Sequence, residues 1–169
     1  MRTLLSATLL LTALWGSPAR SQSTLDQAQT QWYSGRQAQA IELVEAAMAQ
    51  NPLAARPRFT LAWMVQERGD LRRAETLLRA LVQDFPDHAE GLNNLAVIQA
   101  QRGELDAALR GLQLAVQLQP EHAQAQENLG DVLLHLAQRA YGQAAKIQPA
   151  ARLQLKTRQL EQILRPSAN

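Results

Sequence analysis

Three kinds of landmark residue recur in this chain at a constant interval of 34 positions. The glycines are Gly35, Gly69 and Gly103, the alanines are Ala40, Ala74 and Ala108, and the prolines are Pro52, Pro86 and Pro120. This interval is the length of a helix-turn-helix unit in solenoid proteins, where each unit packs only against its neighbours. The periodicity therefore predicts an all-α solenoid.

The phase of these landmarks gives three full repeats, at residues 21–54, 55–88 and 89–122. In each repeat a first helix ends at the glycine, which takes a positive φ without a Cβ clash, and a second helix ends before the proline. In repeat one we expect these helices at about Thr24–Ser34 and Gln37–Gln50. Apolar residues at three- and four-residue steps mark the core faces. The expected core is Ala40, Ile41, Val44, Ala47, Met48, Leu61, Ala62, Val65, Ala74, Leu77, Leu78, Leu81, Val82, Leu92, Leu95, Ala96, Ala108, Leu112, Ala115 and Val116.

Small residues mark the points where paired helices cross. Antiparallel helices approach closely only where their side chains are small, so we expect Ala62 to face Ala74 and Ala96 to face Ala108. Enlarging one of these alanines would overpack the crossing, at a cost of roughly 1–3 kcal/mol.

The fourth repeat, residues 123–149, is shortened. Pro149 follows Pro120 after 29 positions, and the segment between Asp131 and Ala140 lacks a turn glycine. Two structures fit this pattern: a helix pair with a tighter corner, or one long helix. We favour the tighter corner, because three residues match the landmarks of a second helix when counted back from Pro149. They are Ala137, Tyr141 and Ala144.

The C-terminal segment at residues 150–165 carries one apolar stripe, made of Leu153, Leu160, Ile163 and Leu164. Solenoids need a terminal element that covers the last repeat and presents a polar face to water. We interpret this segment as a capping helix, followed by a disordered tail at 166–169.

The first 21 residues have the features of a cleaved signal peptide. Arg2 precedes an apolar run of about a dozen residues, and small residues follow, with cleavage expected after Ala19 or after Ser21. A membrane-spanning helix needs roughly 20 apolar residues, more than this run supplies. The chain has no cysteine, which excludes a lipid anchor on a thiol. We expect a periplasmic or secreted protein that meets membranes only through its partners.

Charge and composition exclude several classes of function. The chain holds 17 basic and 15 acidic residues, interspersed along its length, whereas nucleic-acid binders concentrate positive charge on one face. Without cysteine there is no disulfide, thiolate chemistry or cysteine-ligated zinc. We therefore expect no nucleic-acid partner.

The repeat units resemble the tetratricopeptide repeat family, which has a small residue early in the unit, a glycine at the turn, an alanine in the second helix and a terminal proline. The resemblance covers about Ser21 to Pro149. It departs from the family pattern near the start of the first helix, where a large residue is usual but Thr24 and Arg58 stand, with Leu92 only in repeat three. The aromatic residue usual in the middle of the first helix is also missing. The resemblance implies a right-handed superhelix whose concave face is lined by the first helices.

Under that resemblance, particular first-helix positions face the concave groove. They are Leu25, Gln29, Trp32, Arg56, Phe59, Trp63, Asn93, Asn94, Val97, Glu127, Asn128 and Asp131. Phe59 and Trp63 stand on one helix face, and aromatic residues anchor many interfaces. The alternative is that they pack against repeat one.

Asn94 and Asn128 are in register, one repeat apart. In similar proteins an asparagine at this site hydrogen-bonds the backbone of a bound peptide, and an amide suits an extended segment because it both donates and accepts. Alternatively, both asparagines bond to the neighbouring helix. The family's clamp for a C-terminal carboxylate is absent. Phe59, Trp63, Gln124 and Asn128 occupy its basic and asparagine positions, which makes a receptor for chaperone tails an unfavoured interpretation.

Residues able to carry chemistry are scattered. His88 and His122 are also 34 positions apart, but equivalent positions of adjacent repeats lie too far apart to share an ion at the ~2 Å of a Zn–N bond, so we interpret both as turn residues. His135 lies in mid-helix without a partner four residues later. No serine-histidine-acid set, phosphate loop or pair of carboxylates in a pocket can be assembled. We expect no catalytic residue, no cofactor and no metal.

These observations predict a non-enzymatic adaptor of the bacterial cell envelope that binds a peptide segment of another protein in its groove. The first alternative is a structural protein that self-associates through the groove or through the cap helix near Leu160 and Leu164, as a homo-oligomer. The second is an enzyme acting on cell-wall glycan, which a short solenoid disfavours because it offers no enclosed pocket.

Overall fold

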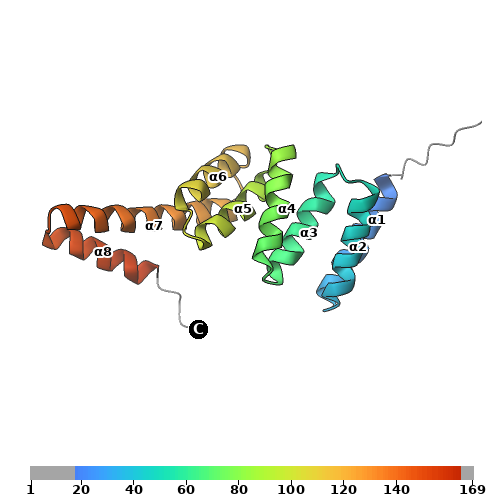
Figure 1. Cartoon of the computed structure of the whole chain (residues 1–169), viewed down its shortest axis with the longest axis horizontal. Coiled ribbons are helices and arrows are strands. Elements are labelled where there is room, and N and C mark those ends of the chain that lie inside the picture. Colours follow the sequence, from blue (N-terminus) through green and yellow to red (C-terminus); the bar gives the residue numbers. More distant parts are fainter. Residues whose placement is uncertain (1–17, 165–169) are drawn as a thin grey trace, which may run out of the picture. The chain divides into compact units, whose positions relative to one another are not determined.

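The structure is a computed structural model that describes residues 18–164 (Figure 1). Eight α-helices and no β-strand occupy this part of the chain, which confirms the predicted all-α solenoid class. The helices are α1 (Pro18–Tyr33), α2 (Gln37–Gln50), α3 (Ala55–Glu67), α4 (Leu71–Asp84), α5 (Ala89–Gln101), α6 (Leu105–Leu118), α7 (Ala123–Ile147) and α8 (Ala151–Ile163). The first helix begins at Pro18, earlier than the expected Thr24, and the second has the expected bounds.

The chain divides into two compact units, one up to Leu53 and the other from Ala54 onward. The first unit contains the hairpin of α1 and α2. In the second unit, α3 pairs with α4 and α5 pairs with α6, while α4 packs against α5. Helix α7 contacts α5 and α6 with its first part and α8 with its second part, and α8 runs back along it (Figure 1).

The three turn glycines have the predicted left-handed backbone. Their φ angles are +82° at Gly35, +82° at Gly69 and +78° at Gly103. At the last of these turns, the Glu104 N–H donates to the Gln99 carbonyl at 2.9 Å, and the Gly103 N–H donates to the Ala100 carbonyl at 2.9 Å. These paired bonds close the end of α5 as a Schellman motif, which requires a residue that tolerates positive φ.

The prolines end the second helices as predicted. The residue before each one leaves the helical region, as for Phe85 at φ −131° and ψ 77° and for Gln119 at φ −134° and ψ 82°. The ring of a following proline clashes with a helical backbone at that position, so the helix stops there.

The crossing alanines are buried as expected. Ala62, Ala74, Ala96 and Ala108 are all 0% exposed. Ala96 and Ala108 belong to one apolar cluster with Leu112 and Val132. Gly111, which the sequence interpretation did not single out, completes this crossing: a Cβ there would lie 3.3 Å from the Cβ of Ala96. The close approach of α5 and α6 therefore needs small residues on both helices.

The expected tighter corner in repeat four is wrong, because α7 is a single helix of 25 residues. Helix α7 contains no proline, and its two glycines, Gly130 and Gly142, lack the positive φ of the three turn glycines. Arg139, located beyond the expected corner, forms a two-bonded ion pair with Asp106 at 2.9 and 3.0 Å. Without a residue that closes a turn, the segment continues the helix, and this ion pair fixes it against the start of α6.

The C-terminal helix α8 packs against α7, and none of its residues is buried. Leu153, Leu160 and Leu164 are half-buried, whereas Ile163 is 63% exposed, so the predicted stripe is wrong at Ile163. Lys156 Nζ lies 4.7 Å from the ring centroid of Tyr141 and 3.3 Å from its hydroxyl, which joins α8 to α7.

No helix within residues 18–164 is long and apolar enough to cross a membrane. The apolar run of the expected signal peptide and the tail at 166–169 lie outside the described residues, and both remain predictions. The two expected cleavage points, after Ala19 and after Ser21, fall within α1.

Candidate functional site

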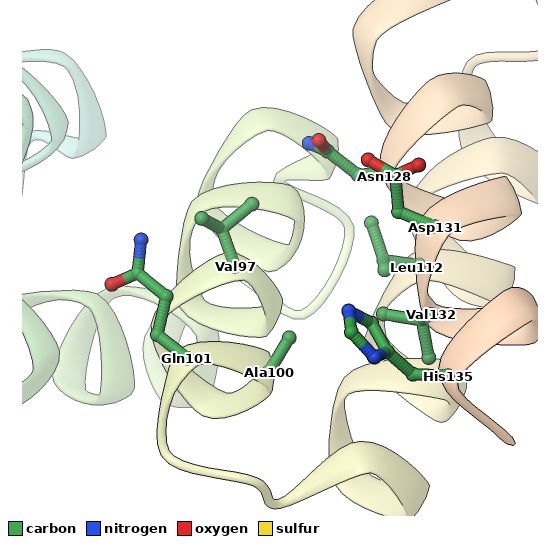
Figure 2. A pocket seen from close by; sticks show the side chains of 8 residues that line it. All are labelled: Val97, Ala100, Gln101, Leu112, Asn128, Asp131, Val132 and His135. Atoms are coloured by element: carbon green, nitrogen blue, oxygen red, sulfur yellow. The ribbon is translucent and has the colours of Figure 1, made fainter. Parts of the chain in front are cut away.

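A cleft of about 200 Å³ opens between α5, α6 and α7 (Figure 2). Its apolar side chains are Val97, Ala100, Leu112 and Val132, and its polar side chains are Gln101, Asn128, Asp131 and His135. Asn128 and Asp131 lie next to each other at one end of the cleft, and His135 lies nearer the other end (Figure 2). The cleft therefore combines an apolar floor with polar groups on its walls.

Helical spacing positions the two walls. Asn128, Asp131 and His135 lie at steps of three and four residues, which places them on one face of α7. Val97, Ala100 and Gln101 follow the same rule on α5. Leu112 comes from α6 and is fully buried beneath them. The cleft exists because the early part of α7 packs alongside both α5 and α6.

A chain of side-chain amides joins α5 to α7 next to the cleft. Asn128 donates from Nδ2 to Oδ1 of Asn93 at 2.8 Å, and Asn93 donates from Nδ2 to Oδ1 of Asn94 at 3.0 Å. Gln124 donates to Oδ1 of Asn128 at 3.3 Å. The alternative in which Asn128 bonds to the neighbouring helix is therefore the one found.

Asn128 nevertheless keeps hydrogen-bonding capacity. A side-chain amide has two N–H donors and two acceptor lone pairs, four sites in all. The bonds to Asn93 and from Gln124 use one donor and one lone pair. One donor and one lone pair remain at a residue that lines the cleft, enough for one peptide unit of a bound segment.

The sequence-predicted groove residues separate into several groups. Val97, Asn128 and Asp131 line the cleft, and Asn93 and Asn94 join it through the amide chain. Glu127 lies on the same helix, exposed to solvent. The expected exposure is wrong for three residues, because Leu25 is 4%, Trp32 is 8% and Asn93 is 4% exposed. For Asn93, burial is explained by its role as the inner member of the amide chain.

Of the remaining groove candidates, Gln29 is exposed on α1 and the others lie on α3, and none of them lines this cleft. Arg56 is exposed, whereas Phe59 and Trp63 are half-buried. The ring of Phe59 packs on that of His88, with centroids 5.0 Å apart. Phe59 thus has a packing partner at the start of α5. Binding of a partner by these α3 residues stays a prediction.

The two in-phase histidines cap helices. His88 Nδ1 accepts from the Gly91 N–H at 3.1 Å, and His122 Nδ1 accepts from the Ala125 N–H at 3.3 Å. Each ring satisfies a donor that the first turn of a helix leaves without an internal partner. A Cβ at Gly91 would come within 2.9 Å of Leu81 and 3.3 Å of the His88 ring, so a small residue is needed beside the first cap. The two histidines recur after 34 positions because each one caps the start of the first helix in its repeat.

Sequence reasoning missed the cleft residues Ala100, Gln101, Leu112, Val132 and His135 as parts of a site. A signal was present: His135 follows Asp131 by four residues and Asn128 by seven, which is one helix face. The sequence analysis considered His135 only as a possible metal ligand in mid-helix, looked for a partner four residues later, and did not relate it to Asp131 four residues earlier.

No group of three or more histidine, aspartate or glutamate side chains in the described part of the chain has the arrangement of a metal site.

Comparisons with known proteins place part of this chain in a family. Residues 59–118 match the family described as the tetratricopeptide repeat. No curated protein matches the sequence.

Solved structures share the fold at low sequence identity. The first tetratricopeptide domain of Spaghetti (RPAP3), bound to an HSP90 peptide, is 14% identical with a TM-score of 0.66, over 74% of this chain and 99% of that one. The Yersinia enterocolitica type III secretion chaperone SycD, in complex with a peptide of the translocator YopD, is 20% identical with a TM-score of 0.62, over 70% and 96%. YrrB, described as having an unusual peptide-binding site, is 21% identical with a TM-score of 0.56, over 63% and 55%.

Proposed function

We propose that this chain, whose residues 59–118 match the tetratricopeptide repeat family, is a non-enzymatic adaptor that binds an extended segment of a partner protein in the cleft between α5 and α7. The observation that carries this proposal is the position of Asn128, which lines an apolar cleft and retains one donor and one acceptor. An extended segment presents unpaired backbone amides that match such a group, whereas the backbone of a helical partner is already satisfied.

The structural neighbours support a peptide as the occupant. The Spaghetti domain and SycD share this fold, and each was solved with a peptide bound. The cleft, at about 200 Å³, is smaller than the roughly 300–1,000 Å³ of typical small-molecule sites. A site of this size suits one side chain of a segment that continues along the surface.

We place this activity in the bacterial cell envelope. The proposal rests on the N-terminal residues, where a basic start, a short apolar run and small residues form the pattern of an export signal. A periplasmic or secreted adaptor would meet its partner after export. Mass spectrometry of the N-terminus of the protein from an envelope fraction tests this placement, which fails if Met1 is retained or if the protein stays in the cytoplasm.

Self-association is a second candidate, favoured by exposed aliphatic residues at the C-terminal end. Ile147 is 86%, Leu155 is 57% and Ile163 is 63% exposed, and α8 has no buried residue. A second copy covering this end would remove these side chains from water. Sedimentation velocity over a wide concentration range tests this candidate, since a monomer at every concentration would exclude it.

A crosslinking pull-down from an envelope extract tests the cleft itself. Val97→Trp places a bulky ring in the cleft, whereas Ala140→Trp places the same ring on an exposed part of α7 outside it. We expect a partner captured by wild type and by Ala140→Trp to be lost from Val97→Trp, with the helical circular dichroism spectrum unchanged. Capture of the same proteins by all three forms would show that the cleft is not the binding site.

A Trp63→Ala variant, read in the same assay, asks whether the predicted groove extends to α3. Loss of the partner from this variant would extend the site beyond the cleft. Retention would confine the site to α5 and α7.

A further inference from the structure

We propose that the cleft is selective for a partner segment in which an aliphatic side chain stands beside a lysine or arginine, the cation pairing with Asp131. This inference rests on the proposed function, because it specifies which segment the cleft accepts. It is carried by the charge of the cleft, by the unpaired state of Asp131 and by the apolar floor next to it.

Among the eight residues that line the cleft, Asp131 is the only carboxylate, and none is lysine or arginine. Asp131 is exposed, and within residues 18–164 its carboxylate makes no ion pair or hydrogen bond.

Three other carboxylates in this unit have an arginine partner on a neighbouring helix. Asp106 pairs with Arg139, Asp84 pairs with Arg58, and Glu75 pairs with both Arg79 and Arg102. The chain thus supplies arginines to these acids and leaves the acid at the cleft without one.

A second acid increases the negative potential beside Asp131. Glu127 lies one helical turn before it on α7 and is exposed. Like charges four residues apart on a helix repel each other and destabilise it. A cation bound near Asp131 would relieve this repulsion, so complementarity favours a basic side chain in the partner.

The apolar floor specifies the neighbour of that basic residue. Val97 and Ala100 are half-buried and lie over the buried Leu112 and Val132, so an aliphatic side chain placed on them would be removed from water together with their exposed surface. Asn128 and Asp131 lie at the same end of the cleft (Figure 2). A segment held by the Asn128 amide would therefore place one side chain over the floor and its neighbour near the Asp131 carboxylate.

Selection from a random peptide display library tests this specificity. Three forms of the chain serve as bait: wild type, Asp131→Lys, and the matched control Glu161→Lys, which makes the same charge change on an exposed residue of α8. We expect wild type and Glu161→Lys to enrich peptides with an aliphatic residue next to lysine or arginine. Asp131→Lys is expected to enrich an acidic residue at that position.

The selected peptide, resynthesised with a fluorophore, gives the size of the effect. Asp131→Asn is expected to weaken its binding about 3- to 5-fold, which is typical of a partly exposed ion pair. Replacing the basic residue of the peptide by glutamine is expected to weaken it equally, and both changes together no further. The difference is expected to shrink as salt is raised, because exposed charges are screened.

The outcomes separate this inference from the proposed function. If wild type selects peptides that Val97→Trp no longer binds, but without a basic residue, the cleft binds segments and the charge selectivity is wrong. If no peptide is enriched, or if enriched peptides bind Val97→Trp equally well, then both the binding of segments in the cleft and its charge selectivity are wrong. If the purified chain instead forms a dimer that Val97→Trp dissociates, the occupant is a second copy, and the selectivity proposal is likewise overturned.

Discussion

Asn128 on α7 and Asn93 on α5 are joined by a hydrogen bond of 2.8 Å between residues 35 positions apart. Asn93 is 4% exposed, and its Nδ2 donates a second hydrogen bond to Oδ1 of Asn94. The pair connects the two helices that form the walls of the cleft. The same bond therefore stabilises the packing of α7 and orients the amide that we assign to partner binding.

Asn93→Ala removes the inner member of this amide chain. We expect the free energy of unfolding to fall by about 1–2 kcal/mol, because a buried hydrogen bond is lost and the Asn128 amide is left without its acceptor. Urea titration followed by circular dichroism measures the change. Asn94→Ala, which removes only the outer acceptor, is the control, with an expected loss below about 0.5 kcal/mol. Equal losses for the two variants would contradict the central role of Asn93.

Gly103→Ala tests the turn between α5 and α6. Nothing lies within 4 Å of the added Cβ, but φ is +78°, so the cost is conformational and is expected at about 1–2 kcal/mol. Gly142→Ala is the matched control: it lies inside α7, also with nothing within 4 Å, and alanine there is expected to stabilise by about 0.5–1 kcal/mol. Thermal unfolding is expected to show a lower melting temperature for Gly103→Ala and a higher one for Gly142→Ala. Shifts of the same sign would contradict the left-handed turn at Gly103.

Ala140→Pro tests whether α7 is one helix. A proline at this position removes a helical hydrogen bond and clashes with the preceding turn, so we expect a loss of about 3 kcal/mol and reduced helical ellipticity. Ala151→Pro is the control, since it occupies the first position of α8, where proline is tolerated, and Ala150 before it is already extended. A much smaller loss, with unchanged ellipticity, would contradict a continuous helix through Ala140.

Glu75 predicts how stability depends on pH. Its buried carboxylate accepts from Arg79 at 2.7 Å and from Arg102 at 2.6 Å, joining α4 to the end of α5. The hydrogen bond from Arg79 is the largest cause that holds the pKa of Glu75 below its ordinary value, with Arg102 adding to it against the opposing effect of burial. A lowered folded-state pKa means that the stabilisation is complete above the unfolded pKa of about 4.3. The stabilisation is lost as the pH falls through the folded-state pKa.

Glu75→Gln is expected to lower the free energy of unfolding at pH 7 by about 1–3 kcal/mol, because charged hydrogen bonds are lost inside the fold. The difference from wild type is expected to narrow between pH 5 and the acid limit. Urea titrations across this range measure it, with Glu121→Gln, an exposed carboxyl, as the control. A gap that stays constant with pH would show that the charge of Glu75 contributes nothing.

The turns, helix ends and helix crossings, which depend on single residues, could be predicted from the sequence. Gly69 and Gly103 predicted turns with positive φ, Pro86 and Pro120 predicted helix ends, and the alanines predicted the crossings. Each of these depends on the backbone freedom or the size of one residue, so it holds with little regard to distant parts of the chain. The same reasoning failed where no such residue stood: between Asp131 and Ala140 the sequence contains only residues that tolerate a helix, and α7 runs on.

The sequence by itself determined the helical class, the 34-residue phase and the places where helices turn, since these follow from local backbone sterics. Tertiary structure decided which side chains meet. The sequence placed Asn93 and Asn128 on first helices of adjacent repeats, but they become one hydrogen-bonded pair only when α7 packs on α5. His135 likewise joins Asp131 at the cleft because both lie on one face of the continuous helix α7. Contacts between residues this distant are set by packing of whole helices, and it is packing that assembled the candidate site.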